Sequence, residues 1–140
     1  MINNPSPPMF NMPHFDAFLF KKKGIKKKLS LEFEQGENIL GGIRLSMQQN
    51  GLNEVTVIGM DGMISEGMIN YFEGNRFMHA KLKDTPILMA SGFFKLSFDD
   101  LFGSMKIVSS GKPPMHGTLT KGTAANGLRL NLTFIELVDK

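Results

Sequence analysis

The sequence predicts an α+β domain in which strands outnumber helices. The 140 residues include 15 Gly and 7 Pro, a turn-rich composition that favours a sheet over a helical bundle. One segment has the apolar period of an amphipathic helix, whereas short segments with strand character, separated by turn residues, make up most of the rest. The length suits one domain with a single core.

The N-terminal part of the chain is predicted to contain an arm followed by a strand. Residues 1–13 contain four prolines and no regular apolar period, so we expect a flexible arm there and a single domain over residues 14–140. Phe15–Phe20 is a short apolar run. Apolar and polar side chains alternate over Ile25–Glu34, which predicts a half-buried strand. Gly24, between two lysine triplets, is the turn expected before it.

The helix is predicted over Glu37–Asn50. Gly51 follows it at the position where a left-handed residue commonly ends a helix. Gly41 and Gly42 lie inside it at a cost of about 1 kcal/mol each relative to Ala, so we expect the helix backbone to pack closely on the sheet. The predicted buried face consists of Ile39, Leu40, Ile43 and Met47.

Strand candidates follow the helix in quick succession. The last is amphipathic, with Leu128, Leu130, Leu132 and Phe134 on one face, and we expect a central strand with one well-covered side. The candidates are residues 54–59, 67–72, 76–81, 87–96, 102–108, 117–120 and 128–137.

The composition excludes several classes of protein. Without cysteine the chain has no disulfide, thiolate metal site or cysteine nucleophile. The N-terminus lacks the basic and apolar regions of a secretory signal, and no later stretch is long and apolar enough to cross a bilayer. We therefore expect a soluble, cytoplasmic protein.

The basic residues are concentrated in one segment. The net charge is +3, and six of the 16 basic residues fall within KKKGIKKK, so that the rest of the chain is mildly acidic. Clustered lysines neutralise phosphates without reading sequence, but a solvated hairpin whose lysines protect an edge strand from pairing would look the same. Few aromatic or Arg side chains stand near them, so sequence-specific readout is not expected. The candidate DNA-binding residues of this lysine-rich segment are Lys21, Lys22, Lys23, Lys26, Lys27 and Lys28.

The order of short motifs resembles the plants-and-prokaryotes-conserved (PPC) domain family. GEN at 36–38 precedes the helix, and NG follows it. A strand that ends in a Gly-rich turn then runs over Val55–Ser65. ILMASGFFKL at 87–96, GTLTKG at 117–122 and the closing LNLTFIEL match the second half. The resemblance extends from about residue 26 to the C-terminus.

This resemblance implies a curled, mostly antiparallel sheet packed against one or two helices, assembled as a homotrimer. It also implies the DNA-binding role usually assigned to the family, in its prokaryotic single-domain form, since no Arg-Gly-Arg-Pro core of an AT-hook occurs here. The alternative is a small-ligand-binding, or degenerate metal-binding, trimer with a cleft between subunits.

The resemblance further places a metal site that this chain has lost. Many prokaryotic members have a His-x-His pair and a third His, which here correspond to Gly103, Met105 and Thr118. His116, two residues away, should point to the same face as Thr118. We therefore expect no metal and no cofactor, and we name Met105, His116 and Thr118 as a candidate cleft.

No catalytic group is identified. His14, His79 and His116 are widely separated and lack metal-ligand spacing. The acidic pairs Asp99–Asp100 and Asp61 with Glu66 have no recognisable His, Ser or Lys partner. The sequence therefore favours a binding protein over an enzyme.

Overall fold

The computed structural model describes residues 22–139, with side chains described over residues 24–137. The predicted arm over residues 1–13, the run Phe15–Phe20 and Lys21 lie outside the described residues. The described chain divides into two compact units. The larger is Lys28–Phe134, and the smaller contains, among described residues, the first residues of β1 and the last of β6.

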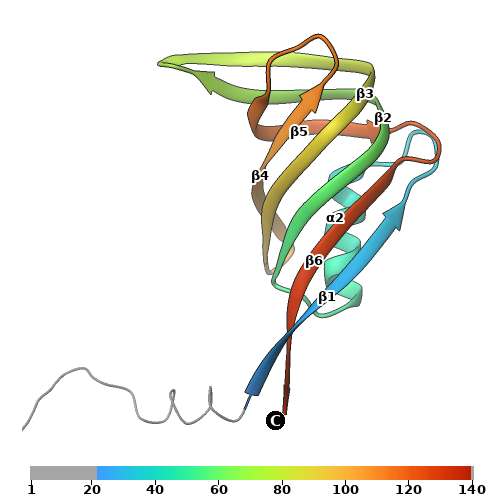
Figure 1. The fold of residues 1–140 in the computed structure, drawn as a ribbon, viewed down its shortest axis with the longest axis vertical. Coiled ribbons are helices and arrows are strands. Elements are labelled where there is room, and N and C mark those ends of the chain that lie inside the picture. The colour runs from blue at the N-terminus through green and yellow to red at the C-terminus, as the bar shows by residue number, and fades with distance from the viewer. Residues whose placement is uncertain (1–21, 140) are drawn as a thin grey trace, which may run out of the picture. The chain divides into compact units, whose positions relative to one another are not determined.

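The predicted α+β class, with a mostly antiparallel sheet and one helix, is confirmed for the described residues (Figure 1). The six strands form one sheet in the order β1-β6-β2-β3-β4-β5, and β2 also pairs with β5. Strands β2 to β5 therefore close into a ring. The elements are β1 (Lys22–Glu32), α2 (Ile39–Gln49), β2 (Glu54–Glu73), β3 (Arg76–Ser97), β4 (Asp100–Ser109), β5 (Met115–Ala124) and β6 (Arg129–Asp139).

Strands β2 and β3 are longer than predicted. The expected strands 54–59 and 67–72 are parts of β2, and 76–81 and 87–96 are parts of β3. Register shifts at bulges interrupt the alternation that sequence reasoning depends on, for example between Val57 and Gly59. The apolar pattern of each long, bent strand therefore resembled that of two short strands.

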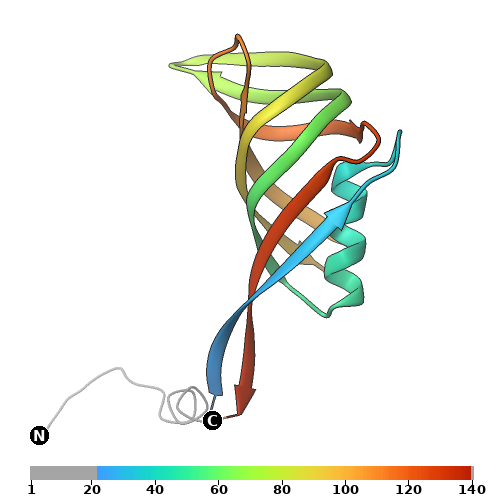
Figure 2. The same cartoon turned by 45° about the vertical axis from the view of Figure 1, so that its right-hand side comes forward.

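The core lies between α2 and one face of the sheet (Figure 2). Ile39, Ile43 and Met47 of the predicted helical face are fully buried, and they join one cluster with the leucines of the last strand. Leu128, Leu130 and Leu132 have no exposed surface, whereas Ile135 on the opposite face is 61% exposed. Leu40 and Phe134, the remaining members of the two predicted faces, are partly buried and pack against the same cluster. The predicted apolar faces of the helix and of the last strand are therefore confirmed.

Both ends of α2 are capped. The side chain of Asn38 accepts a hydrogen bond of 2.7 Å from the Gly41 amide at the N-terminus. At the other end Gly51 has a φ of +64°, and the Leu52 amide donates to the Met47 carbonyl, as expected for a left-handed cap. At 11 residues, the one helix of the described region is too short to cross a bilayer.

The expected turn at Gly24 is wrong, because β1 runs through this position from Lys22 to Glu32. The chain stays extended because β1 pairs with β6, and the arrows of the two strands run in opposite directions (Figure 1). Gly24 also allows a close contact, since a Cβ there would lie 3.1 Å from the Ile135 Cγ2 atom. From Lys22 on, the lysine-rich segment is thus part of a strand and not the tip of a hairpin.

The two helix glycines differ in their surroundings. A Cβ at Gly42 would lie 2.5 Å from the Phe33 ring, and that ring is only 4% exposed. A Cβ at Gly41 would meet only the Asn38 side chain, at an ordinary 3.4 Å. The expected close packing therefore exists at Gly42, against the residue that follows β1, and not at Gly41.

This contrast predicts opposite effects of one substitution at adjacent positions. Gly42→Ala should lower the free energy of unfolding by about 1–3 kcal/mol, because the methyl group overpacks against a buried ring. Gly41→Ala should raise it by up to about 1 kcal/mol through better helix propensity. Urea denaturation at one protein concentration measures both, and equal effects of the two variants would contradict the described packing.

Candidate functional site

From Lys22 on, the lysine-rich segment lies on β1, and its described side chains are exposed. Lys26, Lys27 and Lys28 all face solvent, and the Lys27 Nζ atom is 3.5 Å from Glu136 Oε1. An exposed ion pair of this kind contributes little stability, so it holds Lys27 only loosely. Lys22 and Lys23 belong to the same strand, but their side chains lie outside the described region, as does all of Lys21.

The three candidate cleft residues are neighbours on β4 and β5, but they lie on two different faces of the sheet. Met105 is fully buried on the core face of β4, where it pairs with Gly117. His116 is exposed, and its Nε2 atom lies 3.4 Å from the Ser104 hydroxyl. Because successive side chains of a strand point to opposite faces, His116 and Thr118 share the face away from Met105.

A groove of about 610 Å³ lies beside the start of α2. Gly103 and Thr118, two of the positions that the resemblance assigns to imidazoles, both line it, whereas Met105 and His116 do not. Arg44 and Asp100 supply its charged groups. We call this the α2–β4 groove; its lining is Asn38, Leu40, Gly41, Arg44, Phe94, Asp100, Leu101, Phe102, Gly103, Thr118 and Leu119.

The residues of this region do not fit a divalent metal ion. Gly103 has no side chain, and Thr118 offers only a hydroxyl in place of an imidazole or thiolate. Within residues 24–137, whose side chains are described, no three His, Cys, Asp or Glu side chains are grouped so that they could hold a metal. The α2–β4 groove can therefore interact with a ligand through hydrogen bonds and through one positive and one negative side chain, Arg44 and Asp100.

A second basic cluster, which sequence reasoning did not identify, is contributed by β3 and β5 on either side of β2. Lys81 of β3 and Lys121 of β5 both pair with Met68 of β2, and with Lys83 they line a groove of about 290 Å³. The alternation of Lys81, Leu82 and Lys83 in the sequence could have indicated that Lys81 and Lys83 lie on the same face of a strand. Lys121 is distant in the sequence, and only the strand pairing brings it close.

The sequence matches no protein-family model and no curated protein. Solved structures are similar in fold. A plant- and prokaryote-conserved (PPC) protein from Pyrococcus horikoshii has a TM-score of 0.60 and 17% identity, with 84% of each chain covered. A metal-containing protein from Archaeoglobus fulgidus has a TM-score of 0.56 and 15% identity, with 81% of each chain covered.

A third similar structure is a presumed DNA-binding protein from Ralstonia eutropha JMP134. Its TM-score is 0.56 at 12% identity, over 83% of each chain. The fold class is therefore that of small antiparallel α+β domains with one curled sheet. More narrowly, it is the PPC-domain fold, as the motif order predicted.

The absence of imidazoles at Gly103, Met105 and Thr118 leads to a prediction about metal content. The purified protein should contain well under one equivalent of Zn or Fe per chain, because Gly103, Met105 and Thr118 provide no strong ligand. Elemental analysis after dialysis, with a known zinc protein purified in parallel as the positive control, measures this. A full equivalent per chain would show that other residues supply a site.

Proposed function

We propose that the protein binds DNA with little sequence selectivity through the lysine-rich segment, as a homotrimer. The observation behind the proposal is the exposure of Lys26, Lys27 and Lys28 along one continuous strand. The PPC-domain fold supports it, since its solved relatives include presumed DNA-binding proteins. A strand lined with ammonium groups is complementary to a phosphate backbone.

The type of cation determines the type of binding. Lysine presents a point charge on a flexible stem, and it lacks the planar fork with which arginine reads guanine. No Arg occurs between Lys21 and Lys28. Contacts from this segment should therefore follow the backbone of any sequence, and their strength should depend on salt through counterion release.

The homotrimer is proposed from the resemblance and from an exposed apolar surface. Ile58, Met89 and Phe93 are 49%, 59% and 45% exposed, and all three belong to the paired strands β2 and β3. Apolar groups gathered on one surface commonly mark a contact with another protein chain. We assign this surface to a contact between copies of the chain.

A small-ligand function remains the second candidate, and the α2–β4 groove is the observation that favours it. Arg44 and Asp100 could orient a polar ligand of either charge, and Leu101 and Phe102 add apolar surface. A first DNA-binding measurement distinguishes the two functions. If the wild type fails to bind DNA even at low salt, the groove becomes the better candidate.

The assembly is tested by molar mass. Light scattering at micromolar concentration should give the mass of three chains. Met89→Lys with Phe93→Lys should shift the mass toward one chain, because two buried ammonium groups would oppose the contact. Leu45→Lys, at a 54% exposed position on α2, is the control and should leave the trimer intact. A monomeric wild type would contradict the proposed assembly.

DNA binding is tested by its dependence on salt. Replacing all six lysines of the segment by Gln should abolish duplex binding. The fold should stay intact, because the described lysines of the segment, Lys26 to Lys28, are exposed, and exposed lysines contribute little to stability. The Lys26→Gln, Lys27→Gln, Lys28→Gln variant should reduce the slope of log K against log salt by up to about 3, at about 0.9 for each phosphate contact.

The matched control removes the same charge elsewhere. Lys95→Gln, Lys106→Gln, Lys112→Gln should retain the wild-type salt slope, because those lysines lie outside the segment. Fluorescence anisotropy with a duplex of arbitrary sequence measures all of these affinities. Equal losses in the two triple variants would mean that net charge alone governs binding.

A further inference from the structure

Aromatic and basic side chains share one face of the β2–β3 hairpin. Phe72 pairs with Phe77, and toward the body of the sheet Met68 pairs with Lys81. Alternate positions on a strand point to the same side, so the side chains of these pairs line one face. We call it the hairpin face, and define it as Phe72, Phe77, His79, Lys81, Lys83 and Lys121.

The side chains at the aromatic end of the hairpin face are exposed and contact one another. Phe72 and Phe77 are 68% and 53% exposed, and their ring centroids are 5.3 Å apart. Phe77 also meets the His79 ring edge-on at 4.8 Å. His79 is held in turn by a contact of 2.6 Å between its Nδ1 atom and Asn70 Oδ1. The rings thus form an apolar platform in contact with solvent, with the Phe72 and Phe77 planes tilted by 56° to each other.

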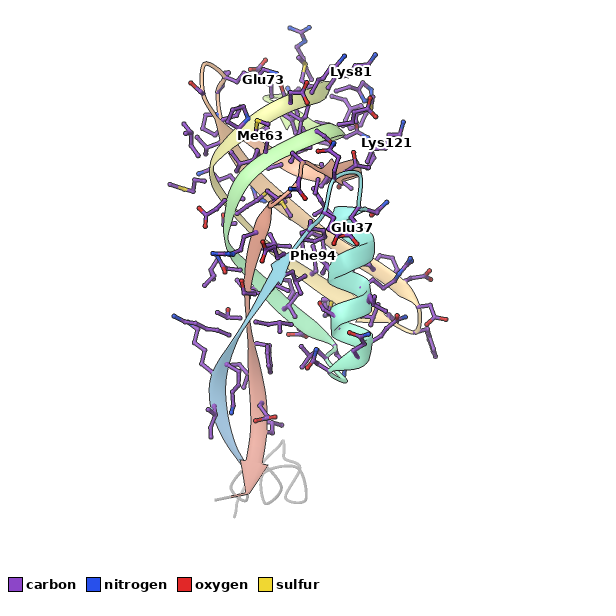
Figure 3. All side chains as sticks on the ribbon, turned by 90° about the vertical axis from the view of Figure 1, so that its right-hand side faces the viewer. Glu37, Met63, Glu73, Lys81, Phe94 and Lys121 are labelled. Atoms are coloured by element: carbon purple, nitrogen blue, oxygen red, sulfur yellow. The ribbon has the colours of Figure 1, made fainter. Side chains whose placement is uncertain are left out.

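The basic end of the hairpin face is contributed by two strands. Lys81 and Lys121 flank Met68 from opposite edges of β2, and they lie on the same side of the ribbon in Figure 3. Lys83 follows two residues along β3, and Glu66 is the one acidic residue lining the groove. Because a strand rises about 3.3 Å per residue, about 20 Å of face separates Phe77 from Lys83.

We infer that the hairpin face binds single-stranded nucleic acid, with bases stacked on Phe72 and Phe77 and with phosphates along Lys81, Lys83 and Lys121. Sequence-tolerant single-strand binding combines two elements, an aromatic platform and a basic track along the backbone. Both are present here on one continuous face. This extends the proposed DNA binding to unpaired strands, and it uses residues outside the lysine-rich segment.

Two other occupants fit the hairpin face less well. A duplex keeps its bases stacked on one another, so their faces cannot reach Phe72 and Phe77. A second copy of the chain could cover the two rings, but the adjoining Lys81, Lys83 and Lys121 are of the type depleted from protein interfaces. A single-stranded nucleic acid can contact both groups at once, with its bases on the two rings and its phosphates on the lysines.

The test compares single-stranded and duplex probes by fluorescence anisotropy. The single-stranded probe is a labelled oligothymidine of about ten nucleotides, within the range that one small domain occupies. Phe72→Ala with Phe77→Ala should weaken its binding about tenfold or more, the loss expected when base stacking is removed. Affinity for the duplex probe should stay within about twofold, because the substitution leaves the lysine-rich segment unchanged.

Two further variants separate stacking and charge from simple hydrophobicity. Phe72→Leu with Phe77→Leu retains apolar surface without a flat ring, so it should lose most of the single-strand affinity as well. Lys81→Gln, Lys83→Gln, Lys121→Gln should reduce the single-strand salt slope by about 2, at about 0.7 for each phosphate. The Lys95→Gln, Lys106→Gln, Lys112→Gln variant should not change it. Circular dichroism confirms that each variant is folded.

The outcomes separate this inference from the proposed function. Single-strand affinity that is unchanged in the Phe variants overturns the inference, whatever the duplex probe shows. A Phe variant that changes its oligomeric state, seen as a change in molar mass by light scattering, also overturns the inference. The two rings would then form a contact between subunits. Loss of duplex binding in the Lys26→Gln, Lys27→Gln, Lys28→Gln variant tests only the lysine-rich segment.

Discussion

The pairing of β2 with three other strands is the constraint on which the rest of the structure depends. One edge of β2 pairs with β3. The other pairs first with β6, over Thr56–Asp61, and then with β5, over Ile64–Tyr71. The exchange occurs around Gly62, whose φ of +125° only glycine adopts readily. A Cβ there would also lie 3.1 Å from the Leu128 backbone.

This exchange of partners creates both the core and the surface. By pairing with β6, β2 lies beside the strand whose leucines join the core cluster with α2. By pairing with β5, it brings Lys121 next to Lys81 and closes the ring of β2 to β5. The apolar cluster and the hairpin face thus arise from successive parts of the same strand.

The two clusters of basic residues described above differ in composition. The lysine-rich segment is continuous in sequence and contains no Arg, so it can supply attraction to phosphates and little else. The hairpin face has fewer lysines but adds two exposed rings, which can contact the flat faces of unpaired bases. The difference in composition corresponds to a difference in the form of nucleic acid that each could hold.

Much of the fold could be predicted from sequence because its signals are local. The period of Ile39, Ile43 and Met47, the cap at Gly51 and the alternation of the leucines in β6 depend on near neighbours along the chain. The order of these elements was enough to predict the PPC-domain fold. The turn at Gly24 was wrong for the opposite reason, because β6, which keeps that segment extended, is distant in sequence.

The sites divide in the same way. The sequence by itself determined the concentration of lysines in one segment and the absence of imidazoles at Gly103, Met105 and Thr118, where the resemblance places them. Only the tertiary structure decided that Met105 lies on the opposite face from His116, and that Lys121 joins Lys81 across β2. The physical reason is that strand register and bulges set which side chains share a face, and both depend on pairing between distant segments.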